Sequence, residues 1–329
     1  MFYYSFIKMA IQDISPRKKK GNIKLFTLLM TMLVFNACSN PKLTNQVHDP
    51  DFIPEIEYPE YPPDTGPKVF IDEAHNNFHT MGGRYKPFAD LLRKDGFRVF
   101  PFKDKFTQAN LKAVDILVIA NPVHKSNVGN WSLPTPSAFT DSEIEIVNNW
   151  VKEGGKLWLI ADHMPIPGAA KKLALSFGFK LENGFAYGPG GNSRIKFSRE
   201  KATLNNHIIS NGTKEYEFVK SVYTYTGHAF QIPPEAQSIL QFASGSYSLN
   251  PQTAHKFDKD TPRLDVSNWS QGAVRNYAKG RVAVFGEAGG FTAQVSGKQR
   301  IKWGMNSVEG SANSRFVLNV MHWLSGDLL

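Results

Sequence analysis

The sequence predicts an α/β fold with a doubly wound, mostly parallel sheet and a partly antiparallel extension. Two observations support this prediction. From Lys68 onward, short apolar runs alternate with segments of helical periodicity, which is the pattern of βαβ units. Between residues 179 and 275 the pattern is less regular and contains stretches of alternating polarity, which are typical of antiparallel strands. At 329 residues and 41% hydrophobic content, the chain can bury a sizeable core.

The first half of the domain alternates strands with amphipathic helices. Pro101 lacks an N–H group to donate, so its strand is expected at an edge of the sheet. Gly96 marks the end of the first helix, and Thr140 with Glu143 forms a capping-box pattern at the start of the second. The predicted strands are 68–72, 97–102, 115–122 and 156–162, and the predicted helices are 83–96, 140–155 and 168–178.

The second half supplies the extension and closes the domain. Alternating stretches at 218–230 and 236–244 predict antiparallel strands. The run GRVAVFGEAGG (280–290) returns to the buried-strand type, and 313–326 predicts a closing amphipathic helix. We find no sequence repeat with a period of about 20 to 50 residues, which excludes a repeat architecture.

Residues 1–37 resemble the signal peptide of a bacterial lipoprotein. A basic segment (17–24) precedes an apolar run of 11 residues (25–35), which is too short to span a bilayer. The run ends at the only cysteine of the chain, Cys38, which we expect to carry palmitate and other lipid. The alternative is an ordinary secretory signal followed by a chance cysteine. Met9 is an alternative start to Met1, since the first eight residues add nothing that export needs.

The expected location is the cell envelope, with a lipid anchor in the outer membrane or on the periplasmic face. Residues 38–66 contain six prolines and few aliphatic residues, so we expect a tether between the lipid and a domain at 67–329. Removing residues 1–37 lowers the net charge from +9 to +4, and no run of Lys or Arg follows. The charge pattern therefore indicates no nucleic-acid partner.

Polar residues of catalytic type follow three of the predicted buried strands. In open parallel sheets, ligands bind beyond the carboxyl ends of the strands, so these residues are expected to share one rim. The candidate catalytic residues are Asp72, Glu73, His75, Asp162, His163 and Glu287. The candidate ligand-binding residues are Asn76, Asn77, His79 and His228.

Each candidate also has an ordinary structural role as an alternative. Asp162 is placed to cap the next helix, and Glu287 to accept N–H groups from its glycine turn. His75 and His79 fit hydrogen-bonded loop residues, and His322 fits a paired core residue. Burying all these groups without partners is costly, so they must pair with each other, with a ligand or with a divalent metal. Zinc or manganese suits such oxygen and nitrogen ligands.

Six segments resemble the class I glutamine amidotransferase-like superfamily, and more closely an exported bacterial lipoprotein branch that lacks the catalytic cysteine. They are VFIDEAHNNFH (69–79), RYKPFADLLRKDGFRV (84–99), DILVIANP (115–122), WVKEGGKLWLIADH (150–163), GRVAVFGEAGGFTAQ (280–294) and NSRFVLNVMHWLSG (313–326). The resemblance implies a flavodoxin-like sheet. Amidotransferases of this class use a cysteine in a G-x-C-x-G elbow, and here that position is Asp162. Glutamine hydrolysis by that route is therefore excluded.

Two functions remain as hypotheses, beside a third reading as a purely structural component of the envelope. The first is a lipid-anchored envelope protein whose domain binds a small polar ligand or a partner at the rim. The second is a metal-dependent hydrolase of envelope or imported glycans or esters, in which Asp or Glu is the general base. The chain contains no G-x-S-x-G motif, and GPGGN (188–192) matches neither a P-loop nor a dinucleotide fingerprint.

Overall fold

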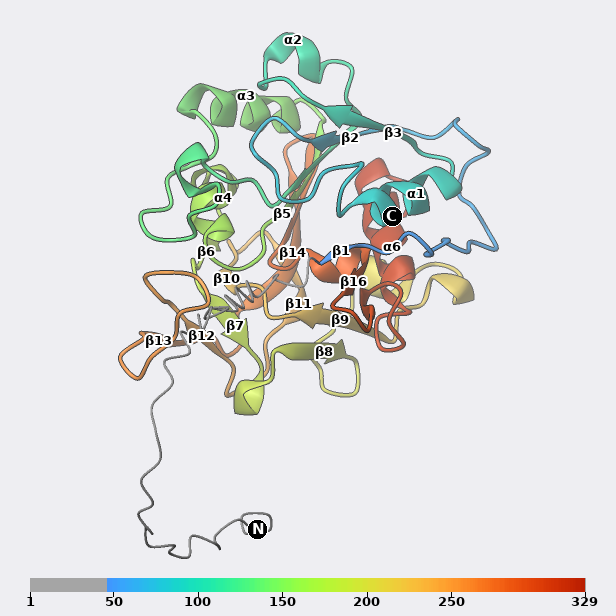
Figure 1. Ribbon diagram of the computed structural model, residues 1–329. Helices are drawn as coiled ribbons and strands as arrows, with labels where there is room; N and C mark the ends of the chain where they lie inside the picture. Colours follow the sequence, from blue (N-terminus) through green and yellow to red (C-terminus); the bar gives the residue numbers. More distant parts are fainter. Residues whose placement is uncertain (1–45, 329) are drawn as a thin grey trace, which may run out of the picture. The chain divides into compact units, whose positions relative to one another are not determined.

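The computed structural model describes residues 46–328, so the signal peptide, Cys38 and the start of the expected tether lie outside the described residues. Within this range a nine-stranded sheet forms the centre of the fold (Figure 1). Its parallel part has the order β3 (Arg98–Phe102), β2 (Lys68–Asp72), β4 (Ile116–Ala120), β5 (Lys156–Ile160) and β15 (Gly280–Phe285). The antiparallel part contains β14 (Ser270–Tyr277), β10 (Phe230–Gln231), β6 (Lys180–Leu181) and β11 (Gln237–Gln241). The predicted fold class is confirmed.

The parallel strands lie where their sequences predict. Every residue of β4 is buried, as expected for an apolar strand between two neighbours. β3 is the last strand on its side of the sheet, and Pro101 lies opposite Ile71 of β2. Because an edge strand leaves one row of N–H groups unpaired, the missing donor of Pro101 costs no ladder hydrogen bond there. The predicted edge position is confirmed.

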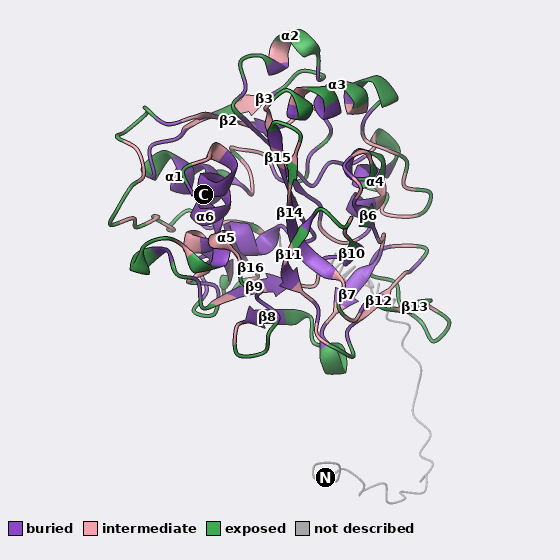
Figure 2. Cartoon of the chain, turned by 180° about the vertical axis from the view of Figure 1, so that it is seen from behind, coloured by how far each residue is buried: buried purple, intermediate pink, exposed green. Residues whose placement is uncertain are grey.

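Helices cover both faces of the sheet. Trp158 and Ile160 of β5 pack in one apolar cluster with α1 (Lys86–Lys94) and α6 (Asn313–Ser325). Leu157 and Leu159 point to the opposite face and pack with α2 (Gln108–Leu111), α3 (Asp141–Lys152) and α4 (Ile166–Ser176). This alternation follows from the two-residue period of a strand. Figure 2 shows the buried strands between these helices; α1, α2, α3 and α4 carry exposed residues, whereas α6 carries none.

Helix ends follow the predicted capping signals. The Thr140 hydroxyl accepts a hydrogen bond from the Glu143 N–H, and the Glu143 carboxylate accepts one from the Thr140 N–H. The predicted capping box is therefore confirmed. α6 ends at Gly326, whose φ of 103° is a left-handed conformation that glycine adopts without steric cost.

Smaller elements surround the central sheet. The sheets are β1 (Val47–His48) with β16 (Ala293–Ser296) and β17 (Ile301–Gly304), β13 (Arg263–Asp265) with β12 (Tyr247–Leu249) and β7 (Phe185–Tyr187), and β8 (Arg194–Ser198) with β9 (Ser221–Tyr225). The short helices are α5 (Ile208–Asn211) and the 3-10 turns Lys125–Asn127, Pro189–Gly191, Glu215–Glu217 and Gly289–Phe291.

The antiparallel region differs from the prediction in two respects. The stretch 218–230 divides between β10, which joins the central sheet, and β9, which pairs only with β8 in its own small sheet. β14 was not predicted at all, although it pairs with β15 along its length. Its sequence SQGAVRNY mixes glycine and polar residues with few apolar ones, so burial by its neighbours rather than its own pattern makes it a strand.

The segment expected as a tether lies against the domain from residue 46 onward. β1 pairs with β16, and Phe52, Ile56 and Tyr61 pack on the same apolar cluster as α1. The high proline content led to the prediction of a tether and gave no sign that these three side chains anchor the segment. Each of them buries apolar surface on the domain. Among residues 46–328, no helix is long and apolar enough to cross a membrane.

Candidate functional site

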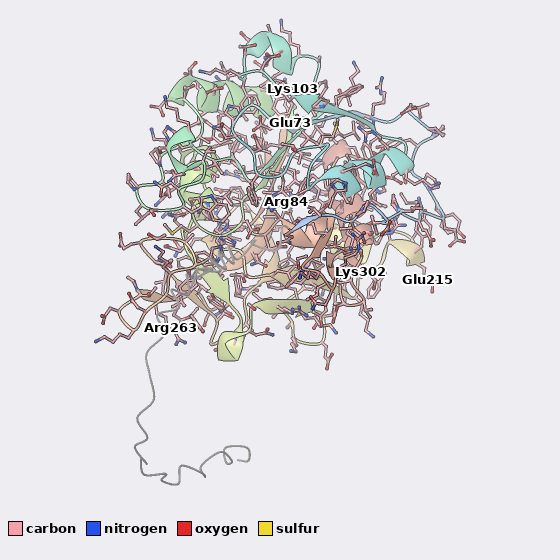
Figure 3. All side chains as sticks on the ribbon, in the orientation of Figure 1. Glu73, Arg84, Lys103, Glu215, Arg263 and Lys302 are labelled. Atoms are coloured by element: carbon pink, nitrogen blue, oxygen red, sulfur yellow. The ribbon has the colours of Figure 1, made fainter. Side chains whose placement is uncertain are left out.

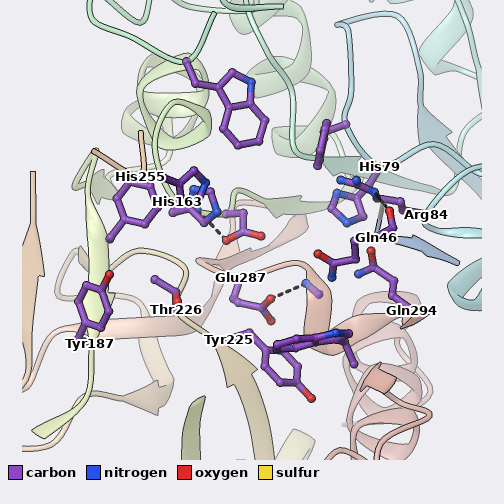
Figure 4. A pocket seen from close by; sticks show the side chains of 16 residues that line it. Gln46, His79, Arg84, His163, Tyr187, Tyr225, Thr226, His255, Glu287 and Gln294 are labelled. Atoms are coloured by element: carbon purple, nitrogen blue, oxygen red, sulfur yellow. Dashed lines mark hydrogen bonds between the residues drawn. The ribbon is translucent and has the colours of Figure 1, made fainter. Parts of the chain in front are cut away.

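A cavity of about 630 Å³ opens at the carboxyl ends of the parallel strands (Figure 4). Asp162 and Glu287 line it, and each lies two residues beyond the end of its strand, β5 or β15. These two strands are neighbours in the sheet, so the two carboxyl groups approach the same space. The acidic and basic residues that line the cavity are Asp162, Glu287, Arg84, His79, His163 and His255.

Asp162 is held in place by the end of the neighbouring strand. Its N–H donates to Asn121 Oδ1 at 2.8 Å, and Asn121 directly follows β4 with a φ of 52°. The Asp162 carboxylate accepts the His163 N–H at 2.8 Å. Burial raises the pKa of Asp162, and the neighbouring His163, Asn121 and Arg84 offset only part of that effect. The carboxyl group is therefore more basic than an ordinary aspartate.

Glu287 is almost completely buried, and its position is set by a glycine turn. Its Oε1 accepts the Gly289 N–H at 2.5 Å and its Oε2 accepts the Gly290 N–H at 2.8 Å. Burial and then the nearby Asp162 charge raise the pKa of Glu287 well above 4.5, and these N–H groups counteract only part of the rise. Because like charges repel in a low dielectric, the Asp162 charge and the burial of Glu287 both favour the protonated form of Glu287.

Arg84 and His79 lie together on another side of the cavity, beside Gln46 and Gln294 (Figure 4). The Arg84 guanidinium lies over the Phe78 ring at 3.8 Å, and its Nε donates to the Gln46 carbonyl oxygen at 2.9 Å. Asn121 Nδ2 donates to His79 Nδ1 at 2.9 Å, so the His79 proton is on Nε2. Burial and then the Arg84 charge lower the pKa of His79 to about 3, which keeps the ring neutral.

Aromatic rings form much of the remaining wall. The His163 ring stacks on Phe185 with centroids 4.3 Å apart, and His255 contacts both rings. Burial and then the His163 charge lower the pKa of His255 to about 4. The aromatic residues that line the cavity are Phe78, Trp131, Phe185, Tyr187, Tyr225 and Trp303.

Asp72 and His75 form a separate buried cluster with Glu143. His75 Nδ1 lies 2.9 Å from both Asp72 carboxylate oxygens, and Nε2 lies 3.1 Å from Glu143 Oε1. The ring is also flanked by Phe106 and Phe139. Since both ring nitrogens face carboxylates, the geometry suits a doubly protonated imidazolium. This cluster does not line the cavity and links β2 to α3.

The other predicted site residues in the loop after β2 form hydrogen bonds that stabilise the loop. Glu73 accepts the Met81 N–H at 2.9 Å, and Asn76, with a φ of 48°, donates to the Val123 carbonyl at 3.1 Å. Asn77 donates to Asp72 at 3.0 Å and accepts the His75 N–H at 3.0 Å. All three therefore stabilise the loop, and none of them lines the cavity.

Two further histidines are buried and hydrogen-bonded. His228 Nδ1 donates to the Ala161 carbonyl at 2.9 Å, and burial lowers the pKa of His228 to about 4. The ring lies next to the segment that carries Asp162, and His228 is not among the residues that line the cavity. His322 Nε2 pairs with Asp95 at 2.6 Å in the core, as the sequence predicted.

The structure divides the predicted rim into two groups. The candidates that line the cavity are Asp162, His163, Glu287 and His79, and those outside it are Asp72, Glu73, His75, Asn76, Asn77 and His228. Among residues 46–328, no group of three His, Cys, Asp or Glu side chains is placed to hold a metal ion.

Several cavity residues were missed in the sequence. Asn121 lies near the end of the predicted strand 115–122 and directly follows β4, so the rule that located Asp162 could also have located it. Arg84 lies in the loop before α1 and has no motif around it. Trp131, Tyr225 and Trp303 come from segments far apart in the chain, so no local signal connects them.

Comparisons with known proteins concern the fold alone. No protein-family profile and no curated protein matches this chain. The mmIFT52 N-terminal domain is similar with a TM-score of 0.54 and 16% identity, covering 78% of this chain and 97% of that domain. A ThuA-like protein from Bacteroides uniformis has a TM-score of 0.44 and 13% identity over 82% of this chain and 94% of its own.

A protein from Thermoplasma acidophilum described as a GMP synthase component has a TM-score of 0.39 and 11% identity, covering 78% of this chain and 94% of its own. The likeness to the mmIFT52 N-terminal domain concerns the fold alone, and the chain is an α/β domain with a large, mostly parallel central sheet. Its sequence contains no cysteine after Cys38.

Proposed function

We propose that the domain binds a small polyhydroxylated ligand, a mono- or disaccharide, in the cavity at the carboxyl ends of β5 and β15. The observation that carries this proposal is the pairing of Asp162 and Glu287 within walls of aromatic rings. Sugars present apolar C–H faces, which pack on aromatic rings, and hydroxyl groups, which bind to carboxyl and imidazole groups. The volume of about 630 Å³ falls in the range of small-molecule sites.

A pair of carboxyl groups in which one keeps its proton suits hydroxyl ligands for a further reason. The protonated carboxyl group donates a hydrogen bond and the ionised one accepts, so the pair matches the dual character of a hydroxyl group. His163 adds a further polar ring to the wall, and because its Nδ1 donates to the Met164 carbonyl at 2.9 Å, Nε2 is the ring nitrogen left for a ligand.

The test is a binding screen on the purified protein. Neutral and acidic mono- and disaccharides are added, and binding is measured by thermal shift and by calorimetry. We expect at least one sugar to raise the melting temperature, and Asp162→Asn to weaken its binding about tenfold or more. The matched control is Asp141→Asn, an exposed residue of α3 outside the cavity. A panel in which no sugar binds contradicts the proposal.

A second candidate function is acid–base hydrolysis of a glycosidic bond by the same carboxyl pair. The raised pKa of Glu287 favours it, because a general acid must keep its proton near neutral pH. Aryl glycosides and oligosaccharides of several sugars provide the assay. Turnover that is lost in both Asp162→Asn and Glu287→Gln supports catalysis, and sugar binding without turnover leaves a binding domain.

We also propose that the protein is held at the cell envelope by a lipid on Cys38. This proposal rests on the order of basic segment, apolar run and cysteine in residues 17–38. A lipid anchor would keep the cavity near the membrane surface, where it would bind sugars that enter or border the envelope.

A further inference from the structure

Arg84 is a cation in the cavity with no carboxylate partner among the described residues. Only its Nε has a protein acceptor there, the Gln46 carbonyl oxygen, and the flat face of the guanidinium covers Phe78. Burial lowers the pKa of Arg84, and the more distant Asp162 charge offsets only part of this effect. A half-buried guanidinium without an ion pair costs free energy, which a bound anion would recover.

His79 places a second unused donor on the same side. Asn121 fixes the ring so that Nε2 carries the proton, and this buried N–H has no acceptor among residues 46–328. Because the ring is neutral, its N–H serves as a donor at physiological pH without adding a competing positive charge. The adjacent Gln46 and Gln294 complete a donor-rich end of the cavity (Figure 4).

The opposite end has a different character. Figure 4 shows His163, His255 and Tyr187 on the far side of Glu287 from Arg84. The site is therefore asymmetric, with a cationic end, a carboxyl pair and an end of histidine and aromatic rings. A ligand with a uniform neutral surface would leave Arg84 unpaired, whereas a ligand with one anionic group would pair it.

We propose that Arg84, with His79 beside it, binds an anionic group of the ligand, so that the sugar carries a carboxylate, phosphate or sulfate. This inference rests on the proposed saccharide function and specifies its ligand class. A guanidinium presents parallel N–H donors that match the oxygen pairs of all three anions. Figure 3 shows Arg84 in the middle of the domain and Arg263 near its periphery. Arg263 and Lys302 are both exposed, so water solvates their charges, whereas Arg84 is half-buried.

The experiment is calorimetry of the purified protein with four probes. They are methyl β-D-glucoside, methyl β-D-glucuronide, glucose 6-phosphate and glucose 6-sulfate. We expect at least one anionic probe to bind about ten- to a hundredfold more tightly than the neutral glucoside, which is the worth of a charge-assisted hydrogen bond. The three anionic probes distinguish a carboxylate from a phosphate or sulfate.

Variants of Arg84 assign the effect to this side chain. Arg84→Gln is expected to reduce the affinity for the preferred anionic probe to that of the neutral glucoside. Arg84→Lys keeps the positive charge but lacks the parallel N–H donors of the guanidinium. It is expected to retain part of the preference for the anionic probe. The control is Lys279→Gln, which removes one charge just before β15, at the opposite end of the sheet from Glu287. Melting curves confirm that each variant is folded.

The outcomes separate the two proposals. If the neutral glucoside binds as tightly as all three anionic probes, the anion inference is overturned and the saccharide function stands. The same holds if Arg84→Gln weakens charged and neutral probes equally. If no probe and no sugar of the wider screen binds, the saccharide function itself fails.

Discussion

His75 Nε2 lies 3.1 Å from Glu143 Oε1, which joins the loop after β2 to the first turn of α3. The same ring bonds Asp72 through Nδ1, so one imidazole connects two buried carboxylates. Glu143 also forms the capping box of α3 with Thr140. The polar stretch that the sequence presented as a catalytic candidate therefore holds two elements of the scaffold together.

Replacement of His75 should destabilise the fold. In His75→Gln, Asp72 and Glu143 lose the cation between them, and an unpaired buried charge is costly. We expect a loss of about 3 kcal/mol in the free energy of unfolding, measured by urea denaturation. His124→Gln is the control, because the His124 ring bonds only within its own turn. Equal stability of the two variants would contradict a structural role for His75.

Stability should also depend on pH through the same histidine. Burial lowers the pKa of His75, but hydrogen bonds and charges from Asp72 and Glu143 outweigh burial and raise the folded-state value above 6.5. The folded state thus binds the proton more tightly than the unfolded chain. The stabilisation is complete below about pH 6.5 and is lost as the pH rises through the folded-state pKa.

Urea unfolding at about pH 6 and about pH 9 provides the measurement for this pH effect. The wild-type protein should lose more stability over this interval than His75→Gln, since the variant lacks the titrating ring. Parallel changes in both proteins would show that other groups cause the pH dependence.

Asp162→Asn should lower the pKa of Glu287. The Asp162 charge is the second cause of the raised Glu287 pKa after burial, and the amide removes that charge while it keeps the shape. Carbon-13 NMR of labelled glutamate carboxyl groups follows the titration directly. Asp141→Asn serves as the matched control on the exposed start of α3. An unchanged Glu287 titration would mean that the two carboxyl groups do not interact.

Trp131→Ala should weaken sugar binding. The Trp131 ring lines the cavity and lies 5.3 Å from Phe78 and 5.9 Å from His163, between centroids. Its removal takes one stacking surface from the ligand, for which we expect a loss of about 1 kcal/mol, or roughly fivefold in affinity. Trp150→Ala on α3 is outside the cavity and should leave affinity unchanged. Calorimetry with the best-binding sugar compares the two variants. Equal affinities of Trp131→Ala and Trp150→Ala would exclude Trp131 from the site.

Cys38→Ser should release the protein from the membrane fraction. The substitution removes the predicted lipid attachment site and leaves the signal peptide intact. Fractionation and immunoblotting compare it with Ser39→Ala, which keeps the cysteine and should stay with membranes. Continued membrane retention of Cys38→Ser would contradict the lipid anchor.

Much of the fold was predictable because its signals are local. The apolar runs of β4 and β5, the proline of β3 and the capping box of α3 each specify an element within a few residues. β14 was missed because its sequence SQGAVRNY contains few apolar residues, although it forms a hairpin with β15, the next strand along the chain. The anchoring of residues 46–66 was missed because Phe52 and Tyr61 pack on segments far along the chain.

The candidate site was only partly predictable. The rule that ligands bind beyond the carboxyl ends of parallel strands pointed to both Asp162 and His75. It could not show that the His75 side chain turns toward Glu143, 68 residues later, while Asp162 lines the cavity. Side-chain direction depends on the available partners, and those partners come from other elements.

The sequence by itself determined the sheet, the positions of Asp162 and Glu287 after β5 and β15, and the absence of a cysteine nucleophile in the domain. These features depend on local periodicity and on residue identity. Only the tertiary structure decided which polar residues share a cavity, that Arg84 lies there without an ion pair among the described residues, and that Trp131 and Trp303 form its walls. Burial and charge interactions act through space, so they exist only once distant segments are packed together.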